Sequence, residues 1–134
     1  MGQLIIGLVF FLSVSLTCYS AIGGELAYTC EVIHVYALAD DGSLQTSSME
    51  KEFRGNQFSV SRVTGEIIGY VVPTLLAKAT RVINQGNHEY SFKAIADFGN
   101  QVQLIEVQEF AQGQQKPFIA TSMGGAGIVT GVCR

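Results

Sequence analysis

Only two side chains in this sequence, those of His34 and His88, have an ordinary pKa close to neutral pH. A Ser–His or Cys–His hydrolase would need one of them beside a nucleophile and an orienting carboxylate. His88 directly follows the turn-forming sequence of residues 84–87, so we expect an exposed loop side chain there. His34 lies in an alternating apolar stretch, where packing is the ordinary role of a histidine. We therefore expect no catalytic residues and predict that this protein is not an enzyme.

Two side chains remain candidates for contact with a ligand, His34 and Arg62. His34 continues the alternating face of Val32, which places its imidazole in the core or at its rim. Arg62 continues the face of Phe58 and could place a cation at the end of an apolar strand, where an anionic head group or a partner carboxylate would bind. The alternative is an arginine whose stem lies along the rim of the sheet.

Acidic side chains occur as two local pairs, Asp40 with Asp41 and Glu50 with Glu52. Glycoside hydrolysis needs two carboxylates that converge from separate elements, with the pKa of one raised by burial. Pairs this close in sequence are typical of solvated surface charge. The sequence Asp40-Asp41-Gly42 begins like a calcium-binding loop but lacks the ligand that closes such a loop. We expect no metal site and no cofactor.

The cysteines indicate cross-linking rather than redox or metal chemistry. Cys30 and Cys133 lie in the part of the chain that we expect to fold, whereas Cys18 precedes it. The pair lacks the Cys-X-X-Cys spacing of a redox site, and the chain lacks a cluster of further zinc ligands. In an oxidising compartment we expect a Cys30–Cys133 disulfide. Such a bond needs Cα atoms within about 7 Å, and so it predicts neighbouring first and last strands.

The N-terminal residues have the pattern of an export signal. Residues 4–16 form a predominantly apolar run, shorter than the ~20 residues of a transmembrane helix and typical of a signal-peptide core. The small residues Cys18 and Ser20 predict cleavage before Ala21. We therefore predict a signal peptide over residues 1–20, a periplasmic or secreted protein, and no stable transmembrane anchor. Acylation of Cys18, as in lipoproteins, is the alternative.

The elements that must position these residues are strands. Alternating residues predict long strands over residues 28–38 and 88–98, and glycine-containing sequences between the apolar runs predict tight turns. Residues 74–79 are the one stretch with helical character. We predict a single all-β domain over residues 21–134, built from eight or nine short antiparallel strands. The expected disulfide favours a β-barrel over a closed sandwich.

The distribution of charge excludes one class of partner. The net charge is −3, and the eight basic residues are scattered along the chain. Nucleic-acid binding draws on a concentrated basic surface that displaces counterions from phosphates. We therefore expect no nucleic-acid partner, and an anionic membrane surface is disfavoured for the same reason.

The sequence Tyr28-Thr29-Cys30, followed by a β-rich chain of this size, is loosely similar to the small periplasmic lysozyme inhibitors. That resemblance implies a disulfide-bearing β-barrel that inserts a loop into an enzyme cleft. The Ser-Gly-containing loop of that family has only residues 62–65 as a counterpart here, so no inhibitory residues are transferred.

We expect a non-catalytic binding protein of the cell envelope that takes a small apolar or amphiphilic ligand. Alternating aromatic residues, among them Tyr36, Phe58 and Phe98, could line its site. The alternative is a protein-interaction module, such as an inhibitor of an envelope hydrolase, that binds its partner through a turn like residues 62–66.

Overall fold

The computed structural model describes residues 26–122 and 127–134, which form nine strands and one short helix. The strands are β1 (Ala27–Leu38), β2 (Leu44–Thr46), β3 (Gln57–Ser61), β4 (Ile67–Gly69), β5 (Ala79–Gln85), β6 (Phe92–Asp97), β7 (Val102–Val107), β8 (Lys116–Ser122) and β9 (Gly127–Cys133), and the helix is α1 (Glu50–Phe53). The predicted signal peptide, its cleavage before Ala21 and Cys18 lie outside the described residues.

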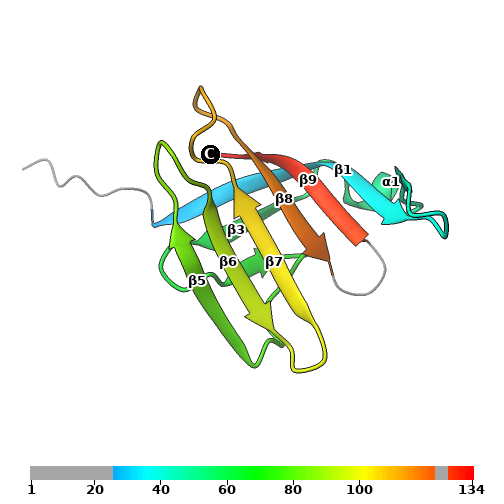
Figure 1. Cartoon of the computed structure of the whole chain (residues 1–134), viewed down its shortest axis with the longest axis horizontal. Coiled ribbons are helices and arrows are strands. Elements are labelled where there is room, and N and C mark those ends of the chain that lie inside the picture. Colours follow the sequence, from blue (N-terminus) through cyan, green and yellow to red (C-terminus); the bar gives the residue numbers. More distant parts are fainter. Residues whose placement is uncertain (1–25, 123–126) are drawn as a thin grey trace, which may run out of the picture.

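All nine strands belong to one antiparallel sheet, which confirms the predicted all-β fold class. The strand order is β4-β3-β1-β9-β8-β7-β6-β5, and β2 pairs with the end of β1. The eight strands of this path curl into a half-barrel (Figure 1). The curl stops short of closure, because within the described residues β4 and β5 lie at opposite ends of the strand order and are not paired with each other.

The predicted disulfide is confirmed. Cys30 in β1 lies directly opposite Cys133 in β9, and their Cα atoms are 3.9 Å apart. The first and last strands are therefore neighbours, as the bond requires. A disulfide of this kind is consistent with an extracellular or periplasmic location.

Within the described parts of the chain, no helix is long and apolar enough to cross a membrane.

The concave side of the half-barrel is filled by alternate side chains of the strands. Four aromatic rings pack there edge to face, Tyr28 against Phe92 at 5.1 Å and Phe58 against Phe118 at 5.2 Å between ring centroids. This geometry is favourable beyond the burial of apolar area, because the positive edge of one ring meets the negative face of the other. Phe58, one of the aromatic residues that we expected could line a ligand site, is buried in the core.

A bulge in β1 changes the side on which His34 lies. The pairing of β1 with β9 shifts between Val32 and His34, so Val35 rather than His34 takes the next inward position. Val32 and Val35 are buried, whereas His34 is exposed. The predicted sharing of one face by His34 and Val32 is wrong, because strict alternation does not survive the extra residue.

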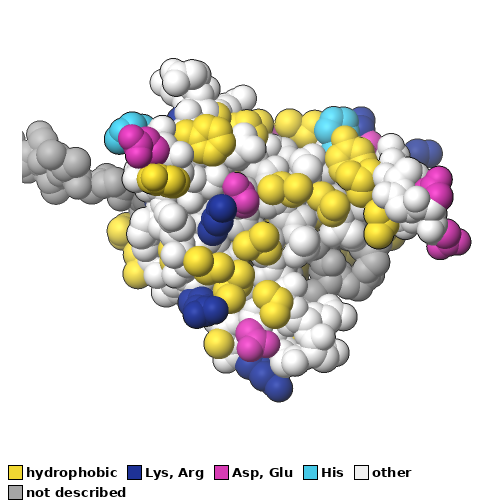
Figure 2. Space-filling model, viewed as in Figure 1, with side chains coloured by type: hydrophobic (Ala, Val, Ile, Leu, Met, Phe, Trp, Pro, Cys, Tyr) yellow, Lys and Arg dark blue, Asp and Glu magenta, His cyan; other side chains and the backbone are white. Residues whose placement is uncertain are grey.

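The convex face of the sheet carries a mixture of apolar and charged side chains. Figure 2 shows hydrophobic side chains over this face with charged groups among them. Ile95 and Leu104 are cross-strand partners on β6 and β7, and Lys93 and Glu106 of the neighbouring row form an ion pair at 3.8 Å. The charges break up the apolar surface of these strands.

Candidate functional site

A groove of about 510 Å³ lies between β4 and β5, the two strands at the ends of the sheet order. Its walls come from β4, from the start of β5 and from the segment that connects them, residues 70–78. Its apolar side chains are those of Ile67, Ile68, Pro73, Leu75, Ala77 and Ala79. The groove therefore occupies the gap that the sheet leaves where a closed barrel would pair its edges.

Large apolar side chains at this groove are unusually exposed. Leu75 is 90% exposed, Leu76 86% and Ile68 75%. Single exposed leucines are common on protein surfaces, but adjacent ones beside an apolar groove are typical of a surface that another molecule covers.

A short turn creates this exposure. The amide of Ala77 donates to the carbonyl of Thr74 at 2.9 Å, which leaves Leu75 and Leu76 at the tip. Thr74 is fixed to β4 in turn, since the Ile67 amide donates to its hydroxyl at 2.8 Å and its own amide donates to the Ile67 carbonyl at 3.2 Å. The predicted helical character of residues 74–79 amounts to this one turn.

The residues before the turn enter the core. Val71 and Val72 are buried, and the side-chain amide of buried Gln103 donates to the Val72 carbonyl at 2.8 Å. Because a buried carbonyl is costly without a donor, this bond fixes the segment beneath the groove.

Gly65, in the turn between β3 and β4, contacts β5 and β6. Its φ is +77°, and a Cβ placed on it would lie 2.9 Å from the Ala94 Cβ and 3.2 Å from the Arg81 carbonyl oxygen. Only glycine permits both this backbone conformation and this approach. The contact places the start of β4 beside β5, next to the groove residue Glu66.

Two charged residues line the groove, Glu66 and Lys78. The Glu66 carboxylate accepts a hydrogen bond from the Thr64 hydroxyl at 3.3 Å. The Lys78 amide donates to the Asp97 carbonyl at 2.7 Å, and the end of its side chain lies against Gly99 in the turn after β6. Within residues 26–122 and 127–134, the Lys78 ammonium has no ion-pair partner.

Arg62 lies outside this groove, in a cluster with Tyr28 and Glu109. Its guanidinium is 3.2 Å from a Glu109 carboxylate oxygen and 4.8 Å from the centre of the Tyr28 ring. The Tyr28 hydroxyl donates to the same carboxylate. Burial, followed by the bond to Glu109, raises the pKa of Tyr28 far above its ordinary value of 10.0. The charge of Arg62 is therefore already balanced by a side chain of the protein.

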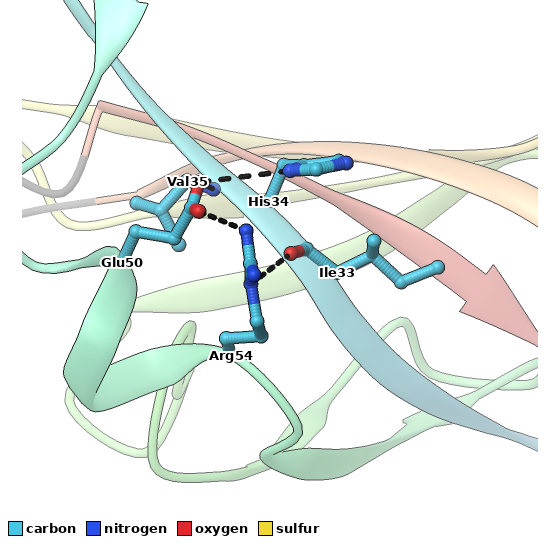
Figure 3. Close-up of polar contacts among 5 residues, drawn as sticks. All are labelled: Ile33, His34, Val35, Glu50 and Arg54. Atoms are coloured by element: carbon cyan, nitrogen blue, oxygen red, sulfur yellow. Dashed lines mark hydrogen bonds and ion pairs between the residues drawn. The ribbon is translucent and has the colours of Figure 1, made fainter.

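His34 lies in a second cluster, with Glu50 and Arg54 of the α1 region (Figure 3). Its Nδ1 is 3.6 Å from a Glu50 carboxylate oxygen, and Arg54 forms an ion pair with the other oxygen of that carboxylate. Arg54 also donates to the Ile33 carbonyl at 3.1 Å. The amide of Val35, then Arg54 and His34, lower the pKa of Glu50 below its ordinary value.

The structure does not bring the two predicted ligand residues together. His34 and Arg62 belong to clusters with no residue in common, and neither lines the groove. Sequence reasoning missed the residues that do, above all Leu75 and Lys78. Their signal was a pair of leucines two residues after Pro73 and close to a lysine, in a segment too short for a buried helix.

Among the residues that the structure describes, no three His, Cys, Asp or Glu side chains gather closely enough to hold a metal ion.

Comparison of the chain with protein-family models, with curated proteins and with solved structures gave no match.

Proposed function

We propose that this protein is an exported, non-catalytic binding protein of the cell envelope, and that its β4–β5 groove takes a small apolar or amphiphilic ligand. The observation that carries the proposal is the groove itself, whose volume of about 510 Å³ falls within the ~300–1,000 Å³ of small-molecule sites. The apolar N-terminal run and the Cys30–Cys133 bond support export to a periplasmic or extracellular location.

The exposed leucines supply the driving force for binding. Covering apolar surface contributes about 25 cal/mol per Å², and Leu75 is 90% and Ile68 75% exposed to water. The hydrogen bonds that hold Thr74 and Val72 support a preformed site. A ligand that enters such a site loses little free energy to ordering the protein.

A titration with Nile red, a neutral dye that fluoresces in apolar surroundings, tests this proposal. Leu75→Glu places a charge in the groove and should weaken binding at least about tenfold, since burying a leucine contributes ~1.5–3 kcal/mol. Leu44→Glu is the matched control, because Leu44 is 55% exposed on β2 and does not line the groove. Equal affinities of the wild type and Leu75→Glu would contradict the proposal.

The second candidate is a protein-interaction module, which the Leu75–Leu76 turn favours. Two adjacent leucines at the tip of a turn could insert into an apolar cleft of an envelope protein such as a hydrolase. Native mass spectrometry of the protein purified from the envelope of its own source separates the two. A bound small molecule supports the ligand-binding function, and a bound protein without one supports the interaction module.

A further inference from the structure

The charges at the groove indicate which class of ligand it takes. Among the described residues that line it, Lys78 is the only cation. Three other cations have acidic partners within the protein, since Arg54 pairs with Glu50, Arg62 with Glu109 and Lys93 with Glu106. Lys51 and Arg81 form no ion pair among the described residues, but neither lines the groove. The Lys78 ammonium has no such partner among the described residues, so a negative group can bind it without displacing another.

The position of the ammonium is limited by its neighbours. The end of the Lys78 side chain lies against Gly99, where any Cβ would overlap it. Asp97 is an acidic neighbour, but its carboxylate accepts the Gly99 amide at 2.7 Å and forms no ion pair with Lys78. The glycine thus provides room for the ammonium beside the turn that follows β6.

Glu66 and Lys78 give the two ends of the groove opposite charges. Glu66 directly follows Gly65, and Gly65 contacts Arg81 of β5. Arg81 lies three residues after Lys78 in the sequence. At ~3.3 Å per residue this separates the Glu66 end from the Lys78 end by roughly 10 Å. A negative head group would be repelled at the first end and attracted at the second, while its apolar chain covers Ile68 and Leu75.

We propose that the ligand of the groove is a single-chain anionic amphiphile, with its head group at Lys78 and its alkyl chain along Ile68 and Leu75. This inference rests on the proposed binding function and names the class of its ligand. The attraction arises from the charge that the protein leaves unpaired and from the apolar surface beside it.

The test uses three probes of equal chain length below their micellar concentrations: dodecanoate, dodecanol and dodecyltrimethylammonium. Displacement of Nile red gives their affinities for the wild type, for Lys78→Gln and for the control Lys51→Gln, an exposed lysine on α1 outside the groove. Mildly alkaline pH keeps the carboxylate ionised. We expect dodecanoate to bind best, and Lys78→Gln to weaken it about fivefold while leaving dodecanol unchanged.

The outcomes separate this inference from the function on which it rests. If dodecanol displaces the dye but Lys78→Gln leaves the affinity for dodecanoate unchanged, the inference is wrong and the binding function stands. If no probe displaces the dye from a folded protein, the binding function itself fails. If Lys51→Gln weakens dodecanoate as much as Lys78→Gln does, the effect is one of overall charge, and the inference fails too.

Discussion

The Glu50 carboxylate accepts a hydrogen bond from the main-chain amide of Val35 at 3.1 Å and takes the place of a missing strand partner. β3 pairs with β1 only as far as Glu31, and β2 pairs only from Tyr36 onward. The Ser47 amide completes the arrangement by donating to the Val35 carbonyl at 2.8 Å. A helix side chain and a loop thus protect a stretch of strand edge from solvent and from other strands.

We predict that Glu50→Gln lowers the melting temperature at neutral pH. We also predict that the melting temperature of this variant falls less than that of the wild type as the pH is lowered. The pKa of Glu50 is lowered from its ordinary 4.5, chiefly by the Val35 amide. This carboxylate therefore stabilises the fold above its unfolded-state pKa, and the stabilisation is lost as the pH falls through the lower folded-state pKa. Circular dichroism melts from neutral to acidic pH measure the effect. Glu31→Gln, on exposed strand surface, is the control, and superimposable profiles for wild type and Glu50→Gln would contradict the prediction.

Reducing the disulfide should destabilise the protein substantially. Cys30 and Cys133 are separated by 103 residues, and cross-linking a loop of this size restricts the unfolded chain by about 4.7 kcal/mol in the chain-entropy account. We expect Cys133→Ser to lower the free energy of unfolding by about 2–5 kcal/mol in urea titrations. The reduced wild type should match the double Cys→Ser variant; a Cys133→Ser variant as stable as the oxidised wild type would show that the bond contributes nothing.

The Tyr28 cluster predicts a second pH effect, at the alkaline end. The pKa of Tyr28 is raised in the folded state above its ordinary value of 10.0. The stability that this hydroxyl contributes to the fold is therefore complete below pH 10.0 and declines as the pH rises above that value. Tyr28→Phe should remove this decline. Urea titrations across the alkaline range measure it, and Tyr90→Phe, on an exposed tyrosine, is the matched control.

Replacement of Gly65 tests whether its contact shapes the groove. Gly42 also has a positive φ, of +84°, but an added Cβ there would meet nothing within 4 Å. We expect Gly42→Ala to cost about 1–2 kcal/mol of stability from backbone strain alone. Gly65→Ala should cost at least about 1 kcal/mol more, because its Cβ also crowds Ala94. Nile red binding should weaken in Gly65→Ala only; equal effects in both variants would mean that the contact is dispensable.

The sequence predicted the all-β class and the disulfide because both depend on local or countable signals. Alternation and turn glycines are local, and the pairing of Cys30 with Cys133 follows from their number. The bulge at His34 could not be predicted, since it is a shift in the pairing of β1 with β9, two strands that lie far apart in the sequence. β6 also begins at Phe92 rather than at His88, because the residues between them form a turn.

The candidate site was harder to predict than the fold. Arg62 was predicted as a cation that could bind an anionic head group or a partner carboxylate, yet the carboxylate beside it is that of Glu109, which is distant in sequence and reaches Arg62 only through the fold. The groove lies between β4 and β5, which do not pair with each other. Local sequence patterns predict strands, but they do not show which strands remain unpaired. Leu75 and Leu76 were visible as apolar residues, but their exposure is a property of the turn that carries them.

The strand order divides the described strands into two stretches, and the β1–β9 pairing is the one place where strands of the two stretches pair. β1 to β4 lie on one side of the β1–β9 pairing and β5 to β9 on the other, and within the second stretch every pairing joins consecutive strands. Such hairpins form quickly, whereas bringing the first strand to the last must first overcome the entropy of closing nearly the whole chain. The Cys30–Cys133 bond joins β1 to β9 within this pairing. In an oxidised chain the disulfide already holds β1 and β9 close together, so refolding does not have to wait for this long-range contact to form.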